Sequence, residues 1–497
     1  MKNRRPVVLM VLQYILQSRY LMFLSAAVTV LCYYLGWDIV FLYYLILLCC
    51  LMLFFLRDLT TMIPHLALLA IFTSVQNSTS SQTGASDYYA RPVIYVQIGV
   101  LAILLAAAFI FRFYRIARER TFKPNAIFWG LCILSAAFLL NGVGAADYVW
   151  TNLLFGVVLA FCFLVIYVLF AGSIKVTEEN FIKLCWGFAA MSAVLVLYEF
   201  VKYIQLMPEL KLFIQGEASF DDFRQNLVYG WGMYNTMGLW LNICIPAIFL
   251  LASKYRHGWA LVLYATVVAG FTVLTCSRQA LIGLVITYPL PAIVSMVKGK
   301  RWKVSLCIIC AAVLAVAIVC LCNLSSVKEL VTEIFSSLTD DEGNYTGNGR
   351  FSLITLAMDH FAEYPFFGSG WFLDFYGNGT QDTLNVALIP GMAHDTFAEI
   401  LAACGMVGLL AYCIHRIQTI IEFVKNPSAD KLIMAMSIVA LLIMSLMDNH
   451  IFYMLPTIFY AGMLPFVCTD KKEEPMVQLS VQLPAERQSK RKWGRTA

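Results

Sequence analysis

The chain has 497 residues, of which 61% are hydrophobic and 13% are charged, and its formal net charge is +5. A soluble domain carries about 45–50% apolar and about 25% charged residues. The composition therefore excludes a water-soluble globular enzyme, a disordered chain and a nucleic-acid-binding protein with a basic surface. An all-α, multi-pass membrane protein remains, in which the position of the charges matters more than their sum.

Apolar runs long enough to cross a bilayer follow one another along most of the chain. A span needs about 20 apolar residues, and the sequence offers about fourteen candidates. The third candidate is the weakest, because Pro64 and His65 interrupt it. The expected spans are 20–37, 38–56, 59–75, 92–111, 125–141, 151–171, 181–201, 234–252, 258–275, 279–297, 304–322, 396–415, 430–447 and 450–468.

The distribution of Lys and Arg predicts the orientation of these spans. With both termini in the cytoplasm, about 28 of the 35 basic residues fall on the cytoplasmic side, as the charge rule requires. The opposite orientation reverses that ratio, so we reject it. The extracytoplasmic side then receives one large loop, 323–393, with a helical pattern from Arg350 to Glu363 that ends at Tyr364-Pro365 and precedes Gly368-Ser-Gly370.

Three regions follow from this reading. Residues 1–200 hold the N-terminal transmembrane helices, and residues 201–468 form a membrane core that includes the loop 323–393 with short helices. Residues 469–497 form a basic, polar cytoplasmic tail that we expect to be disordered. No nucleotide-binding loop is recognisable in the sequence. The acidic run Asp340-Asp341-Glu342 could hold a divalent cation, but adjacent acidic residues in a loop are usually only solvated, so we expect no metal and no cofactor.

Basic residues on the extracytoplasmic side are scarce, which makes each of them a candidate anion ligand. Arg278 lies in the short turn between the expected spans 258–275 and 279–297, Arg350 begins the helical pattern in the large loop, and Arg224 precedes an aromatic and Gly-rich stretch. Guanidinium groups bind phosphate in bidentate fashion. The alternatives are an arginine that reaches to lipid headgroups for Arg278, and ordinary solvated charges for Arg350 and Arg224.

Histidine and carboxylate residues gather where the chain returns to the membrane. His394 is followed by Asp395 and then Glu399, and a histidine at that boundary can act as a general base. Asp448 and His450 lie in the last extracytoplasmic turn and could support such a site. Each of these residues could also have a purely structural role, as a lone histidine more often does.

The stretch from Arg350 to Gly408 resembles the signature of the O-antigen ligase and O-antigen polymerase superfamily. It contains Arg350, then Tyr364-Pro365-Phe-Phe-Gly368-Ser-Gly370, then His394-Asp395, nine residues, and Gly405-x-x-Gly408. The Ser277-Arg278 turn and the loop from Arg224 to Asn235 resemble two further elements of that superfamily. The likeness covers about residues 200–465. Asp395 departs from the ligase pattern, in which a small polar or amide residue is usual.

This resemblance implies a metal-independent glycosyltransferase of the bacterial cytoplasmic membrane, with its active site on the outer face. The donor would be a glycan on undecaprenyl diphosphate, and the acceptor a hydroxyl of a glycan or lipid. His394 would be the catalytic base and Arg278, Arg350 and Arg224 would bind the diphosphate, supported by Asp395, Glu399, Asp448 and His450. Aromatic residues such as Trp371 could stack on sugars. Further expected partners are membrane lipids, a flippase and a chain-length regulator, and no nucleic acid.

Two alternatives stay open from the sequence. A polymerase for O-antigen, capsule or exopolysaccharide and a ligase to another acceptor would use the same residues, so the sequence does not separate them. A transporter or flippase of lipid-linked oligosaccharides has a similar size, but it would place charged residues at mid-membrane depth. The candidate residues here lie mostly in one outside loop, which favours the enzyme.

Overall fold

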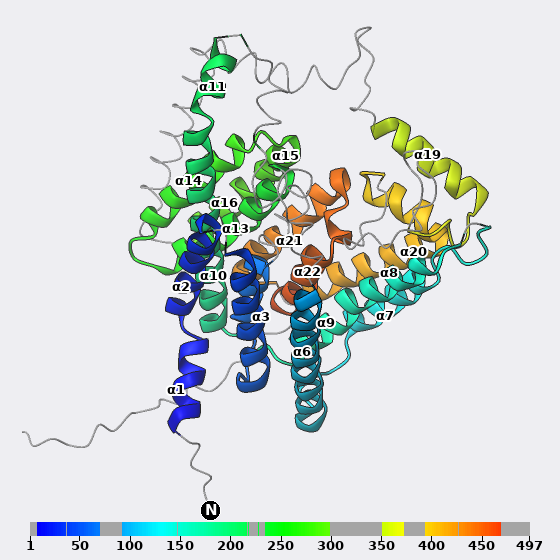
Figure 1. Ribbon diagram of the computed structural model, residues 1–497, viewed down its shortest axis with the longest axis horizontal. Helices are drawn as coiled ribbons and strands as arrows, with labels where there is room; N and C mark the ends of the chain where they lie inside the picture. Colours follow the sequence, from blue (N-terminus) through cyan, green and yellow to red (C-terminus); the bar gives the residue numbers. More distant parts are fainter. Residues whose placement is uncertain are drawn as a thin grey trace, which may run out of the picture.

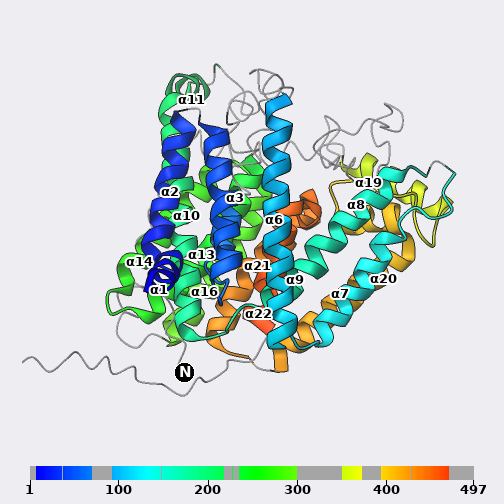
Figure 2. The same ribbon diagram turned by 60° about the horizontal axis from the view of Figure 1, so that its bottom comes forward.

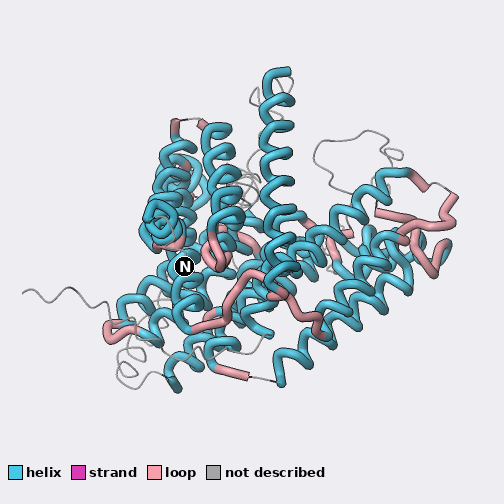
Figure 3. The backbone as a smooth tube through the Cα atoms, turned by 90° about the horizontal axis from the view of Figure 1, so that it is seen from below, coloured by secondary structure: helices cyan, strands magenta, loops and turns pink. Residues whose placement is uncertain are grey.

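The computed structural model describes residues 7–35, 37–69, 92–146, 148–215, 217, 227, 234–298, 350–371, 393–425 and 427–468. Within these ranges the chain forms helices joined by loops and turns, and no strand occurs (Figure 3). The predicted all-α class is therefore confirmed. The expected loop 323–393 is described only at 350–371 and 393, and the tail 469–497 lies outside the described residues.

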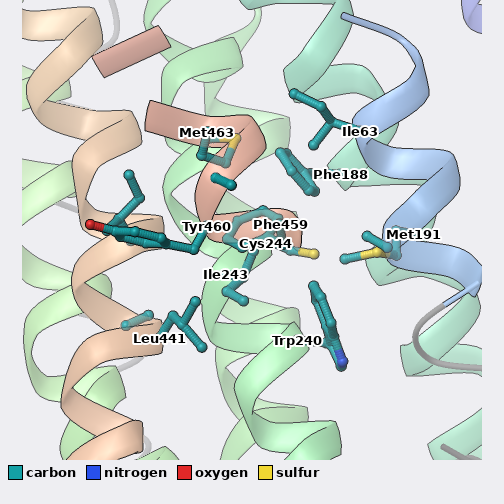
Figure 4. Packing of buried hydrophobic residues seen from close by; sticks show 14 of the residues in the cluster. Ile63, Phe188, Met191, Trp240, Ile243, Cys244, Leu441, Phe459, Tyr460 and Met463 are labelled. Atoms are coloured by element: carbon teal, nitrogen blue, oxygen red, sulfur yellow. The ribbon is translucent and has the colours of Figure 1, made fainter. Parts of the chain in front are cut away.

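One buried helix, α13 (Tyr234–Lys254), organises the central bundle (Figure 1). It is apolar on all sides, as expected for a helix surrounded by other helices rather than lipid. Figure 4 shows its Trp240 side chain, whose ring centroid lies 5.7 Å from that of Phe459. The helices in contact with it are α10 (Glu178–Gln205), α14 (Gly258–Leu274), α15 (Arg278–Thr287), α16 (Pro289–Lys298) and α21 (Ala429–Asp448).

The N-terminal helices pack on one side of this bundle, where α2 contacts α10 and α3 contacts α6 (Figure 2). Their sequences are apolar without a marked polar face, which suits helices that meet lipid on one side and protein on the other. The short helix α11 follows α10 at its far end. The bounds are α1 (Val7–Leu16), α2 (Arg19–Tyr34), α3 (Asp38–Phe55), α6 (Pro92–Glu119) and α11 (Met207–Ile214).

A third group of helices, inclined to α2, α3 and α6, extends from the other side of the bundle (Figure 2). In it α20 packs along α7, α7 packs on α8, and α19 packs on α20. Helix α19 coincides with the helical pattern predicted in the large loop. The elements are α7 (Ala126–Leu139), α8 (Trp150–Ala160), the π-turn η1 (Phe161–Val165), α9 (Ile166–Ala171), α19 (Arg350–Glu363) and α20 (Thr396–Lys425). The 3₁₀ turn η3 (His450–Phe452) and α22 (Met454–Cys468) follow α21 and connect this group to the bundle, since α22 contacts both α21 and α9.

Seven helices of the described part are long and apolar enough to cross a membrane, or eight if the bent pair Val8–Leu16 and Arg19–Cys32 forms one span. Four shorter apolar helices of 10–17 residues accompany them. The predicted multi-pass architecture is confirmed, whereas the count of fourteen spans is not. The expected span 279–297 is one of these seven, as Arg278–Val297, although Pro289 divides it into α15 and α16 because proline cannot donate the helical hydrogen bond. The expected span 304–322 lies outside the described residues.

The bundle has two chemically different ends, which we name after one residue each. At the Lys254 end, α13 terminates and Lys254 Nζ contacts carboxylate oxygens of Glu178 and Asp430. Arg112 of α6 lies at this end too, where it donates hydrogen bonds to the carbonyl oxygens of Leu56 and Arg57. At the His394 end, α13, α15 and α20 begin and α21 terminates.

Candidate active site

The termini of four helices meet around one histidine–carboxylate pair at the His394 end. His394 immediately precedes the first turn of α20, and its Nδ1 lies 2.8 Å from Oδ1 of Asp448, the last residue of α21. Since an ionised carboxylate only accepts hydrogen bonds, Nδ1 carries the proton in this contact and Nε2 is left as the basic nitrogen. The His394 side chain is 31% exposed and that of Asp448 is 13% exposed.

Asn235 connects this pair to the start of α15. Its Nδ2 donates to Oδ2 of Asp448 over 2.9 Å, and its Oδ1 accepts from the Ser277 hydroxyl over 2.7 Å. Ser277 is the N-cap of α15, because its Oγ also accepts the backbone N–H of Ala280. A continuous chain of hydrogen-bonded groups therefore runs from His394 to the residue immediately before Arg278.

Arg278 is the first residue of α15, so it lies at the positive end of the helix dipole, where backbone N–H groups are not used within the helix. Its side chain is partly buried. The neighbouring Gln279 donates from Nε2 to the carbonyl oxygen of Met447, which precedes Asp448. This contact holds the start of α15 against the end of α21, so two sequence-predicted residues, Arg278 and His394, are carried by helix ends that are tied together.

A second carboxylate, Glu399, is buried behind the pair. Its Oε2 accepts the backbone N–H of Ala393 over 2.7 Å and the side-chain amide of Asn449 over 3.1 Å. Ala393 precedes His394 in the chain and Asn449 follows Asp448. One carboxylate oxygen thus ties together the backbone on both sides of the histidine–aspartate contact.

The turns around the site hold unusual backbone conformations. Cys276, His394 and Asn449 have φ of 56°, 52° and 53°, and the only other non-glycine residue with positive φ in the described chain is Arg120. A non-glycine residue in this region costs about 1–3 kcal/mol, and such residues cluster at functional sites. All three turns flank the hydrogen-bonded chain. Asn449 is the C-cap of α21, where asparagine adopts this conformation readily, so the strain falls on Cys276 and His394.

Helix α20, which begins beside His394, is broken at Gly405. This residue, with φ 62° and ψ −159°, interrupts the helical hydrogen bonds. The segment 364–370 replaces them: Ser369 and Gly370 donate backbone N–H groups to the carbonyls of Ala402 and Ala403. In the other direction, the N–H groups of Met406 and Val407 reach the carbonyls of Pro365 and Phe366.

This exchange explains two of the glycines in the sequence signature. A Cβ on Gly405 would lie 2.5 Å from the carbonyl carbon of Phe366, and one on Gly368 would lie 2.4 Å from that of Ala403. Both distances are too short for a side chain, and both glycines also have positive φ. The two glycines therefore fasten the segment after α19 to the helix that begins beside His394.

The remaining predicted site residues fall into different places. Asp395 caps α20, since its Oδ1 accepts the N–H groups of Phe397 and Ala398. His450 is buried in η3, with Nε2 3.6 Å from Oδ2 of Asp448. Arg350 begins α19, which packs on α20, but its side chain lies outside the described residues, as does Arg224 altogether.

The sugar-stacking role considered for Trp371 is wrong. Its side chain is fully buried, with ring centroids of Phe138, Phe155 and Phe452 within 5.4 Å. It anchors the chain where α19 and the segment 364–370 return to the bundle.

Sequence reasoning missed Asn235 as a member of the site and did not pair Asp448 with His394. Asn235 lies only at the edge of an aromatic, Gly-rich stretch, and Asp448 comes 54 residues after His394. The available signal was a polar residue at the end of an apolar run, which is common. Within the described ranges no group of three or more His, Cys, Asp or Glu residues could hold a metal ion.

Fold and site together define the class: a multi-pass, all-helical membrane protein with a polar site where helix termini meet. Residues 260–413 match the family model described as O-antigen ligase, and this segment contains Arg278, Arg350, His394 and Gly405. The match confirms the predicted resemblance to the O-antigen ligase and polymerase superfamily. Asn235 and Asp448 lie outside the matched segment. No curated protein sequence matches this chain.

Proposed function

We propose that the protein is a membrane glycosyltransferase that moves a glycan from undecaprenyl diphosphate to an acceptor hydroxyl, in the polymerisation or ligation of a surface polysaccharide. The observation that carries this proposal is the His394–Asp448 pair, linked through Asn235 and Ser277 to the helix start that bears Arg278. The match of this segment to the O-antigen ligase family supports the reaction type.

His394 is suited to the role of general base. Asp448 holds Nδ1–H, so Nε2 faces away from the carboxylate and can accept a proton. In the proposed reaction the acceptor oxygen attacks the anomeric carbon, its proton passes to Nε2, and the bond between that carbon and the diphosphate oxygen breaks. Asp448 keeps the ring in one orientation and stabilises the imidazolium that forms, as the carboxylate does in a catalytic triad.

Arg278 is suited to the leaving group. The diphosphate departs with the bonding electron pair, so negative charge grows on its oxygens. A guanidinium stays protonated and binds two oxygens at once, and the N-terminus of α15 adds a favourable dipole. Charge prearranged in this way favours the transition state over the ground state. Arg350 and Arg224 are proposed to complete the diphosphate site, and Asp395, Glu399 and His450 to support it.

We propose that the His394 end faces outward and the Lys254 end faces the cytoplasm, in the bacterial cytoplasmic membrane. Basic residues occupy the last two turns of α6 and the position after it, close to the Lys254 end: Arg112, Arg115, Arg118 and Arg120. Basic residues favour the cytoplasmic side.

Cysteine labelling tests this orientation. Phe366, 71% exposed, lies in the segment tied to α20, and His257 is exposed next to the Lys254 end. In intact cells a membrane-impermeant maleimide should react with Phe366→Cys and spare His257→Cys, beyond the background of the parent chain. Labelling of His257→Cys alone would reverse the proposed orientation.

Analysis of surface glycans and lipid-linked intermediates in a deletion strain tests the function. Loss of long chains with single repeats still transferred would identify a polymerase, and accumulation of long lipid-linked chains would identify a ligase. Intermediates held on the inner leaflet would instead identify a flippase and overturn the proposal. The position of the site favours the enzyme: His394 and Asp448 lie at helix termini at one end of the bundle, whereas a transporter would place charged residues at mid-membrane depth.

A further inference from the structure

Asn235 contacts both halves of the site through one side-chain amide. Its amide nitrogen faces the carboxylate that orients His394, and its amide oxygen faces the N-cap hydroxyl of the helix that begins with Arg278. Its side chain is buried, so water competes weakly for either contact. The two contacts fix the orientation of the Asn235 amide group. The Asp448 carboxylate can only accept a hydrogen bond, so it faces the amide nitrogen, and the Ser277 hydroxyl donates to the amide oxygen.

Asn235 fixes the orientation of the Asp448 carboxylate through its second oxygen, Oδ2. Oδ1 serves His394, while Oδ2 lies 2.9 Å from Asn235 Nδ2 and 3.6 Å from His450 Nε2. Without the Asn235 amide, Oδ2 would lose this donor and the carboxylate would be free to rotate toward His450, which would weaken its hold on His394 Nδ1. An amide at this place therefore selects one carboxylate orientation out of two.

We infer that Asn235 is a positioning residue that sets the His394 tautomer through Asp448 and fixes the distance between the base and the start of α15. This inference rests on the proposed function for its effect on turnover, but its effect on His394 does not. Bond formation needs the base and the leaving-group site in one register, and misplacement by about 1 Å can cost about 10²-fold in rate.

Two substitutions separate the contacts. Asn235→Ala removes both. Asn235→Asp keeps the volume and the acceptor for Ser277, but in its ionised form it lacks the donor and sets a second carboxylate against Asp448. Like charges disfavour that form, so this variant is measured at alkaline pH, where both carboxyl groups are ionised. We expect each variant to lower kcat by about 10²-fold with little change in the KM for donor. Asn235→Asp, as the near-isosteric variant, keeps the test valid if Asn235→Ala folds poorly.

Asn242 provides a matched control on the same helix. It is buried two turns further along α13 and also bridges to α15, through the Ala280 carbonyl at 2.9 Å and the Thr287 hydroxyl at 2.8 Å. It does not contact Asp448. Asn242→Ala should lower the thermal stability while kcat stays close to wild type, so a loss of activity confined to the Asn235 variants cannot come from weaker helix packing alone.

The decisive readout is the state of His394 itself. Protein with ¹⁵N-labelled histidine, in lipid nanodiscs, should show an Nδ1–H signal that is lost in His394→Gln, and this loss assigns it to His394. The buried His65, whose Nδ1 donates to the Thr61 carbonyl, gives a second signal of this kind that remains in His394→Gln. Both Asn235 variants should shift the His394 ring toward a mixture of tautomers, and Asn242→Ala should not. An unchanged ring in both Asn235 variants would overturn the inference.

Turnover is measured with lipid-linked oligosaccharide extracted from cells that lack this chain. In an Asp448→Ala background, Asn235→Ala should cause no further loss, since its effect passes through Asp448. Additive losses would contradict the inference. Failure of the wild-type protein to transfer glycan would contradict the proposed function instead. The tautomer measurement would still test whether Asn235 positions His394.

Discussion

Both ends of the helix bundle bury charged side chains, but they use them differently. At the Lys254 end each charge is matched directly: Lys254 contacts two carboxylates, and Arg112 contacts backbone carbonyls. At the His394 end the carboxylates of Asp448 and Glu399 hold other groups in place, among backbone turns with positive φ. Direct matching stabilises the folded chain, whereas the chain of contacts at the His394 end holds the groups that we propose act on a substrate.

Removal of the base should have the largest effect. His394→Ala should lower kcat by about 10²–10⁴-fold, because the proton of the acceptor hydroxyl loses the group positioned to receive it. Asp448→Asn should lose activity on a similar scale, since the amide no longer fixes the ring or balances its charge. The measurement is transfer from lipid-linked oligosaccharide in proteoliposomes. His257→Ala, an exposed histidine near the Lys254 end, is the control and should retain full activity.

Arg278 should rank next. Arg278→Ala should lower kcat by about 10²–10³-fold through loss of one prearranged donor to the leaving group. Arg278→Lys should recover part of the rate, because a lysine supplies charge without the bidentate fork. Arg256→Ala removes an exposed arginine near the Lys254 end and serves as the comparison. Equal activity of Arg278→Ala and Arg256→Ala would remove Arg278 from the site.

Substitution at the break in α20 should lower the stability of the fold more than the rate of glycan transfer. Gly405→Ala forces a side chain against Phe366 in a left-handed conformation, so we expect about 2–4 kcal/mol of destabilisation, seen as a lower Tm in detergent. A Cβ added to Gly270, inside α14, would meet no atom within 4 Å. Gly270→Ala should therefore leave stability unchanged or raise it by up to about 1 kcal/mol. An unchanged Tm in Gly405→Ala would mean that α20 can form a continuous helix without hydrogen bonds to the segment 364–370.

The Lys254 end should give the smallest response. Glu178 is 61% exposed, so its ion pair with Lys254 is screened by water, and Glu178→Gln should cost less than about 1 kcal/mol. Glycan transfer should be unaffected. A marked loss of transfer with an unchanged Tm would show that the two ends are not as distinct in role as their contacts indicate.

The sequence predicted those features that depend on neighbours along the chain. Apolar runs predicted most of the described helices, and the pattern from Arg350 to Glu363 matched α19 at both ends. Arg278 and His394 were also predicted to face the same side, because the order of the spans, oriented by the distribution of Lys and Arg, puts both in extracytoplasmic segments. Local composition was sufficient in these cases.

Features that depend on distant pairings were not predictable in the same way. The contact of His394 with Asp448 and the bridge by Asn235 join segments more than 40 residues apart. The insertion of 364–370 into α20 replaces hydrogen bonds within a helix by bonds between segments, which no periodicity reveals. The sequence signature contained the glycines that permit this insertion, but only the structure shows the backbone contacts that require them.

Burial at Trp371 and at Ala393 has one more consequence. Both residues are fixed by contacts with the helices: the Trp371 ring packs against aromatic rings, and the Ala393 backbone N–H donates to the Glu399 carboxylate. The sequence between them, 372–392, begins and ends at fixed anchors, so its length and composition can diverge without displacing the imidazole. Under the proposed function, substitutions between the two anchors should therefore leave the position of His394 unchanged.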